Sequence, residues 1–370
     1  MTGGGRPRLA LLVAGAAALA AVLALAVWRR DGFFHGYLAA FLLVVGVPLG
    51  ALAILMVHHL TGGRWGWSVR PSLESALATL PLVAVLFTPL LLGLDDLYSF
   101  ARPDAVAADH LLQHKRPYLN VPFWVVRSAA FFAVWIVGAV LLRRWGRRDA
   151  DADAPTVRLL RLAAGGLVIW VVTVTFAAID WIGALQPHWY SSVWGAYVFI
   201  GFALTAHAVA TLSVTGAPWR PREDASPDML NDLGNLLLML VILHAYLGFA
   251  QFFVTWNGDQ PHESGWYLPR IRGPWMVVAV VLGSTHFALP FLALLFRAVK
   301  RGRRALASIA LLVLAARALE AAWFVLPVRA VEHLYALLVA TVSVAAVGGL
   351  AGGVYLSALA RARLLTGDDR

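Results

Sequence analysis

The run FFHGYLAAFLLVVGVPLGALAILMV, residues 33–57, decides the fold class of this chain. It contains no Asp, Glu, Lys or Arg. A helix that crosses a membrane needs about 20 largely apolar residues, because each residue advances about 1.5 Å through a hydrocarbon layer of about 30 Å. The run is therefore predicted to cross a membrane as a helix.

Similar apolar windows recur along the whole chain. They predict spans near 9–28, 33–57, 73–94, 120–142, 160–182, 190–214, 233–256, 274–296, 305–327 and 334–359. The connections are short, so we predict one all-α membrane domain, residues 1–370, with about ten transmembrane helices. The first window can also be read as a signal peptide, since Arg6 and Arg8 precede it. Its length favours a retained helix.

The composition excludes several classes of protein. Hydrophobic residues make up 60% of the chain and charged residues 14%, whereas about a quarter of a soluble domain is charged. There is no cysteine, which excludes disulfides, cysteine-ligated iron–sulfur clusters, thioether-attached haem and thiolate zinc sites. The net charge of +10 comes from basic residues in short loops, a topology signal and not a nucleic-acid surface.

Basic residues also predict the orientation. With the N-terminus inside, 20 of the 30 Lys and Arg residues fall in inner segments and eight in outer loops, although Arg29 and Arg30 oppose the trend. Both termini are therefore predicted to be cytoplasmic. Seven tryptophans at the predicted outer ends are expected to face the membrane–water interface: Trp124, Trp181, Trp189, Trp194, Trp256, Trp266 and Trp275.

Polar residues in or beside the spans are the candidates for function. A charge at the bilayer centre costs about 2.5–3.5 kcal/mol, so such groups pair with each other or line wet cavities. The proton-path candidates are Asp180, His188, His207, His244, Gln251, His286, Glu320 and Glu74, and the fixed-charge candidates are Arg127 and Arg317. Glu320 follows Arg317 by three positions, so the two share a helix face and are predicted to pair.

Each candidate also has a structural interpretation. Arg317 and Glu320 would form a self-neutralised pair, and Asp180 would cap or brace the outer end of its helix. A single buried histidine often links helices through a hydrogen bond. Glu74 follows Ser72 near the predicted start of a span, where an acid suits the helix N-terminus.

Without cysteine, an electron carrier held by this chain would have to be a haem on His or Met, or a quinone. His244 and His286 are predicted at similar depth, as a bis-histidine haem requires. Membrane cytochromes usually present several such pairs, and this chain has one. We expect no haem and no other metal on this chain.

Two stretches carry a family resemblance: HKRPYLNVPFW at 114–124, which leads to Arg127, and DWIGALQPHWYSS at 180–192. With the run HAY at 244–246 and the Gln251-Phe252 pair, they resemble the NrfD-type (polysulfide-reductase-like) membrane subunits of alternative complex III, a bacterial quinol:electron-acceptor oxidoreductase. The second, smaller (ActF-like) subunit is the most similar. The short N-terminus and the Arg-rich, Ala-rich spans depart from that pattern, which leaves a related NrfD-type complex open.

The resemblance implies two four-helix bundles: spans two to five, mainly residues 33–142, and spans six to nine, residues 190–327. It implies a bacterial inner membrane and several partners: a larger NrfD-like sister subunit, a peripheral iron–sulfur subunit, cytochrome c subunits and a terminal oxidase. Iron–sulfur clusters and haem c would lie in those partners, with quinone or menaquinone nearby. This chain would hold no redox centre, and would support assembly and move protons coupled to quinol oxidation.

Three other functions stay open at this point. The chain could bind quinol itself, with Trp124, Phe131 and Tyr190 as quinone-pocket candidates, although the family assigns that task to the sister subunit. It could be a passive membrane anchor. It could also be a secondary transporter, but its two halves show no matching helix breaks.

Overall fold

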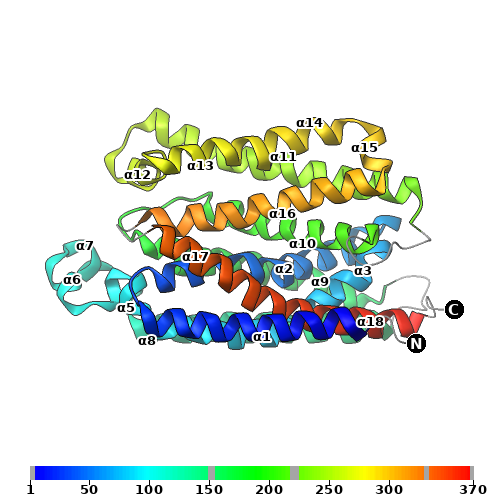
Figure 1. Cartoon of the computed structure of the whole chain (residues 1–370), viewed down its shortest axis with the longest axis horizontal. Helices are drawn as coiled ribbons and strands as arrows, with labels where there is room; N and C mark the ends of the chain where they lie inside the picture. Colours follow the sequence, from blue (N-terminus) through cyan, green and yellow to red (C-terminus); the bar gives the residue numbers. More distant parts are fainter. Residues whose placement is uncertain (1–4, 149–154, 217–224, 329–332, 367–370) are drawn as a thin grey trace.

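The computed structural model describes residues 5–148, 155–216, 225–328 and 333–366. Within these ranges the chain is all-α and contains no strand, as predicted. Long helices lie side by side along the long axis of the molecule (Figure 1). Arg220, Arg222, Arg329 and Arg370, which entered the predicted charge distribution, lie outside the described residues.

Nine helices in the described ranges are long and apolar enough to cross a membrane, and one bent pair raises the number to ten. They confirm the prediction of a multi-pass integral membrane protein. The straight spans are α1 (Gly5–Trp28), α2 (Phe33–Thr61), α8 (Val121–Arg148), α9 (Val157–Trp181), α10 (Trp194–Thr215), α11 (Pro227–Gly258) and α16 (Arg303–Val325). Two spans contain a π-helical segment: α13 (Pro274–Leu282), η4 (Gly283–Ala288) and α14 (Leu289–Leu295); and α17 (His333–Ser343), η6 (Val344–Gly348) and α18 (Gly349–Thr366).

The bent pair corrects the predicted span at 73–94. It consists of α3 (Arg64–Leu77) and α4 (Leu80–Leu91), which meet at 44°. Pro81 causes the break, because in a continuous helix its ring would clash with the carbonyl of Leu77, four positions earlier. Leu77 is the last residue of α3. The hydroxyl of Thr79 donates to the carbonyl of Ala76 at 2.7 Å and satisfies an acceptor at the helix end.

Short elements join the spans at the two ends of the molecule. They are α5 (Leu94–Leu97), η1 (Ser99–Ala101), α6 (Pro103–Ala108), α7 (His110–Lys115), η2 (Gly183–Leu185), α12 (Pro261–Tyr267), η3 (Leu268–Arg270), α15 (Arg297–Arg301) and η5 (Leu326–Val328). Helices α5, α6, α7 and α12 gather at the end that the charge distribution predicts to be outer, and α15 lies at the opposite end (Figure 1).

Helix α2 forms the centre of the molecule and is buried along most of its length. Its glycines allow close contact with α10. A Cβ at Gly50 would meet the backbone carbonyl of Phe202, and one at Gly46 would lie 2.8 Å from the Phe202 ring. Small residues at helix crossings let backbones approach in membranes, where packing drives association because lipid is as apolar as the side chains.

The remaining helices pack on both sides of this centre. Helices α3, α4, α8, α9 and α16 contact α2, while α11 and α16 also pack against α10, and α14 packs against α11 and α16. The division into two bundles stays a prediction. Helix α1 lies antiparallel to α18: a Cβ at Gly349 would lie 3.0 Å from Gly15 Cα, and one at Gly353 would lie 2.5 Å from Leu12.

The predicted interfacial role of the tryptophans is wrong for six of the seven. Trp256 is 67% exposed, whereas Trp124, Trp181, Trp189, Trp194, Trp266 and Trp275 are each at most 6% exposed. The indoles pack against each other and against neighbouring rings. Trp189 stacks on Trp266 with ring centroids 4.3 Å apart. Aromatic stacking inside the protein therefore outweighs the preference of an indole for the interface.

Candidate functional site

One buried carboxylate is the centre of the candidate site. Glu320 lies on α16 and is 2% exposed. Its Oε1 lies 2.9 Å from Nε2 of His244 on α11 and 3.7 Å from Nδ1 of His286 in η4. Its Oε2 pairs with Nη1 of Arg317, one turn earlier on α16. The predicted pairing of Arg317 with Glu320 is confirmed.

Tyr197 adds a hydroxyl to this carboxylate. It lies near the start of α10 and donates a hydrogen bond to Oε1 of Glu320. Its ring also stacks on the imidazole of His244, with centroids 4.5 Å apart and planes inclined by 19°. The same oxygen of Glu320 thus faces a phenol and two imidazoles. These groups can all donate hydrogen bonds, and imidazole can also exchange protons near neutral pH.

Arg317 is held by α10 as well as by Glu320. Its Nε donates to Oγ1 of Thr205 at 3.2 Å, and its Nη1 lies 3.4 Å from Nε2 of His244. Gly201 makes room for the guanidinium, since a Cβ there would lie 2.6 Å from Nη2. The positive charge is therefore fixed beside both the carboxylate and one imidazole.

His286 reaches the carboxylate through a wide helical turn. It lies in the π-helical segment η4, where the turn holds one residue more than in an α-helix. Pro290 follows four positions later and has no N–H for the carbonyl of His286. The wider turn brings the His286 ring to 4.7 Å from the His244 ring. Pro290 is the sequence signal for this distortion.

His244, His286 and Glu320 are also residue types that bind metals. Each presents one ligand atom, and these atoms lie within 4.8 Å of one another. Arg317 already pairs with Glu320 and lies close to His244, so a divalent cation between the three would face a fixed positive charge.

Asp180 forms a second buried ion pair, at the end of α9 that the charge distribution predicts to be outer. Arg127 donates to it through Nε at 2.8 Å and through Nη2 at 3.0 Å, and Tyr118 donates its hydroxyl at 2.9 Å. The guanidinium also lies over the Tyr118 ring, 3.8 Å from its centroid. Two-point pairing of this kind fixes geometry. This geometry agrees with the structural interpretation of Asp180, in which the residue caps or braces the end of its helix.

The two stretches that carry the family resemblance meet in space. Tyr118 and Arg127 bind Asp180, and Nε1 of Trp124 donates to the Asp180 carbonyl at 2.9 Å. Further out, Nζ of Lys115 donates to the carbonyl of Pro187 at 2.5 Å. The 114–124 and 180–192 stretches therefore form one interlocked outer structure.

The other proton-path candidates lie away from Glu320 and have their own partners. His207 Nε2 lies 2.9 Å from the carbonyl of Leu233 and links α10 to α11. Gln251 accepts a hydrogen bond from Ser191, and His188 Nε2 lies 2.6 Å from Oδ2 of Asp109 in the outer loops.

Glu74 differs from its expected position. We expected an acid near a helix N-terminus, but α3 begins at Arg64, so Glu74 lies in its third turn. It accepts instead from Nε of Arg70 at 2.7 Å, one turn earlier. Arg147 of α8 lies 3.8 Å away. The helix begins early because its amphipathic first half packs on protein, where an apolar window cannot detect it.

The three quinone-pocket candidates differ in their exposure and in their partners. Trp124 and Phe131 are buried and stack on Phe87 and Trp135. Tyr190 is 63% exposed in an outer loop. Their role in binding a quinone stays a prediction.

Arg270, which is fully buried in η3, was not among the predicted site residues. Its guanidinium donates to the carbonyls of Trp266, Trp323 and Phe324 and, at 2.9 Å, to Oε1 of Gln186. It thus joins the α12 loop, the end of α16 and the 180–192 hairpin. Burial lowers the pKa of Arg270. Nothing in a local window distinguishes this arginine from the basic residues around it.

The contact between His188 and Asp109 changes the pKa of the Asp109 carboxyl. The hydrogen bond from His188 lowers the pKa of the Asp109 carboxyl below its ordinary value of 3.8, aided by hydrogen bonds from the backbone N–H groups of Leu111 and Leu112. Asp109 also caps α7 through those two N–H groups. Protonation of this half-buried carboxylate would therefore release a loop contact and a helix cap together.

The chain matches none of the protein-family models and none of the curated proteins with which it was compared.

Proposed function

We propose that this chain moves protons in the membrane domain of a quinol-oxidising complex of the alternative complex III type, with Glu320 as the proton-exchanging group. One observation carries the proposal: a membrane-buried carboxylate oxygen lies in contact with a tyrosine hydroxyl and two imidazoles. The quinol-oxidising complex itself is proposed from the resemblance of residues 114–124 and 180–192.

The residues around Glu320 differ chemically from those around Asp180. The partners of Asp180 are an arginine and a phenol, neither of which exchanges protons readily near neutral pH. Glu320 instead faces His244 and His286, whose free imidazoles titrate in the physiological range. One nitrogen on each ring, Nδ1 of His244 and Nε2 of His286, is buried with no hydrogen-bond partner among the described residues. Each of these nitrogens is available to a proton or a water molecule.

Arg317 supplies the charge that such a site requires. Guanidinium stays protonated in proteins, so Arg317 is a fixed charge and not a carrier. Its position favours the carboxylate form of Glu320 and the neutral form of His244. A proton that arrives on an imidazole is therefore expected to leave again, because neither the imidazolium nor the protonated acid is strongly favoured. This is the electrostatic requirement of a relay.

The test compares two buried carboxylates in the assembled complex. Glu320→Gln and Asp180→Asn each remove one charge and keep the size of the side chain. With the complex reconstituted in vesicles, we expect Glu320→Gln to reduce proton release per quinol oxidised at least tenfold. Asp180→Asn should lower the yield of assembled complex, but the proton release of each assembled complex should match the wild type.

The opposite pattern would assign the proton path to Asp180. Unchanged proton release in both variants would leave the chain as a passive anchor. Purification of the chain in mild detergent without an iron–sulfur or haem c subunit would contradict the proposed complex while leaving proton exchange at Glu320 to be tested in vesicles.

A further inference from the structure

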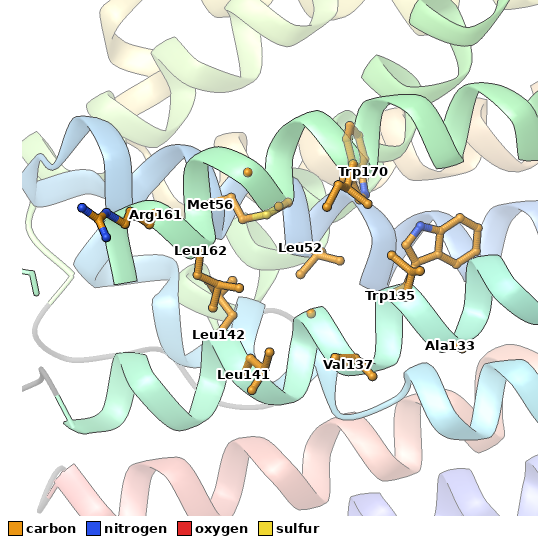
Figure 2. A pocket seen from close by; sticks show the side chains of 15 residues that line it. Leu52, Met56, Ala133, Trp135, Val137, Leu141, Leu142, Arg161, Leu162 and Trp170 are labelled. Carbon is orange, nitrogen blue, oxygen red and sulfur yellow. The ribbon is translucent and has the colours of Figure 1, made fainter. Parts of the chain in front are cut away.

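A long apolar groove opens between α8 and α9, away from the Glu320 cluster. It has a volume of about 510 Å³, and Leu52 and Met56 of α2 form part of its lining. Figure 2 shows Arg161 at one end and Trp135 and Trp170 towards the other. Arg161 is the one charged residue among the described residues that line it.

Glycines create the groove. A Cβ added at Gly138 of α8 or at Gly165 of α9 would have no heavy atom within 4 Å. At Gly166 a Cβ would lie 2.9 Å from Sδ of Met56, so the Met56 side chain bounds the groove at that position. Three missing side chains thus leave an elongated space between two helices that otherwise pack together.

The length of the groove matches one leaflet of a bilayer. Arg161 and Trp170 are nine residues apart on α9, a rise of about 13 Å. This is about half of the 30 Å hydrocarbon thickness. The buried Trp135 and Trp170, at 1% and 3% exposed, lie towards the deep end. An acyl chain that enters at Arg161 would therefore reach about the midplane.

The mouth of the groove is basic. The segment 143–161 holds six arginines and three aspartates, an excess of positive charge. Arg161 and Arg158 are exposed, and Arg158 lies over the Trp145 ring, 3.8 Å from its centroid. Among the described residues no carboxylate pairs with Arg161. Basic rims between transmembrane helices attract the phosphates of anionic lipids.

We propose that this groove is a binding site for an anionic phospholipid, with its phosphate at Arg161 and one acyl chain between α8 and α9. The proposal combines an apolar channel one leaflet long with a cation at its interfacial end. It is independent of the function proposed for Glu320.

The test uses the purified full chain, the probe lipids dioleoyl phosphatidylglycerol and dioleoyl phosphatidylcholine, and native mass spectrometry to count bound lipid. The wild type should retain phosphatidylglycerol in preference to phosphatidylcholine. Arg161→Gln should weaken phosphatidylglycerol binding about fivefold and leave phosphatidylcholine unchanged, as expected for the loss of one interfacial basic residue. The matched charge control is Arg297→Gln, at an exposed arginine on α15 at the same end of the molecule.

Filling the groove tests the acyl chain separately. The double variant Gly138→Leu/Gly165→Leu should lose the retained lipid of both kinds, because each new side chain projects into open space. Val140→Leu, on an exposed face of α8 outside the groove, is the control. Equal retention of the two lipids by the wild type, or unchanged retention in the filled variant, would overturn the proposal. Loss of a co-extracted protein subunit in place of lipid would also overturn it, since the groove would then be a subunit contact.

Discussion

Nε2 of His244 lies 2.9 Å from Oε1 of Glu320, although the two residues are 76 positions apart on different spans. Both are almost fully buried, and Arg317 contacts each of them. A buried charge is stable only when its partners are in place, so α11 and α16 are tied together by electrostatics as well as by packing. The stability of this cluster and its chemistry can be separated by substitution.

Removing the charge of Glu320 should destabilise the protein because it leaves Arg317 buried without a counter-charge. We expect Glu320→Gln to lower the free energy of unfolding by about 3–5 kcal/mol. The double variant Glu320→Gln/Arg317→Gln should recover most of this loss, because neither charge remains. Thermal unfolding in detergent measures both. Proton release should stay low in the double variant, and recovery of release with stability would show that Glu320 has only a structural role.

His244 can be tested without removing its hydrogen bond. The amide of His244→Gln can still donate to Glu320 but cannot exchange protons near neutral pH. We expect proton release to fall at least tenfold and the unfolding temperature to stay close to that of the wild type. His207→Gln is the matched control, since His207 bonds only a backbone carbonyl among the described residues. Equal effects of the two variants on proton release would contradict the assignment of His244.

The close contact of α2 with α10 requires a glycine at position 50, because there is no room for a Cβ. Gly50→Ala should lower the free energy of unfolding by about 2 kcal/mol or more, because the new methyl group would meet the carbonyl of Phe202 and the helices would have to separate. Gly138→Ala, on α8, has open space around its Cβ and should be nearly neutral. If differential scanning calorimetry finds the two variants alike, the close packing of α2 against α10 is not required.

Acid should release the outer loop at Asp109. The pKa of its carboxyl is lowered, chiefly by the hydrogen bond with His188, so its stabilising contribution is complete above pH 3.8 and is lost as the pH falls through the lowered pKa. Hydrogen exchange of the Leu111 and Leu112 amides should therefore stay slow to below pH 3.8 and then accelerate. Asp109→Asn should change this pH dependence. Acceleration already well above pH 3.8 in the wild type would contradict the capping contact.

The sequence predicted the spans because apolar length is a local property. Windows around 33–57 and 233–256 lie within α2 and α11. The predicted span at 73–94 omits the first half of α3, where Arg70 and Glu74 neutralise each other at 2.7 Å and the helix packs against α2, α10 and α18. The windows also placed Trp124 at an interface, since a window cannot show that a ring stacks on Phe87.

The candidate site was only partly predictable for the same reason. The pairing of Arg317 with Glu320 follows from a spacing of three on one helix. The approach of His286 depends on the π-helical turn, and the approach of Tyr197 depends on the position of α10, so neither is contained in local spacing. The separation of Asp180 from the Glu320 cluster is likewise a property of the packed helices.

The antiparallel packing of α1 against α18 determines whether the chain crosses the membrane an even or an odd number of times. Helix α1 begins at Gly5 and α18 ends at Thr366, and these two helix termini lie at the same end of the molecule (Figure 1). A chain that starts and finishes on one side of a bilayer must traverse it an even number of times. Nine traversals would put those residues on opposite sides, so the bent pair α3–α4 must itself pass from one face to the other and is not a re-entrant loop. The kink at Pro81 therefore lies within a traversal that every later helix depends on for its direction.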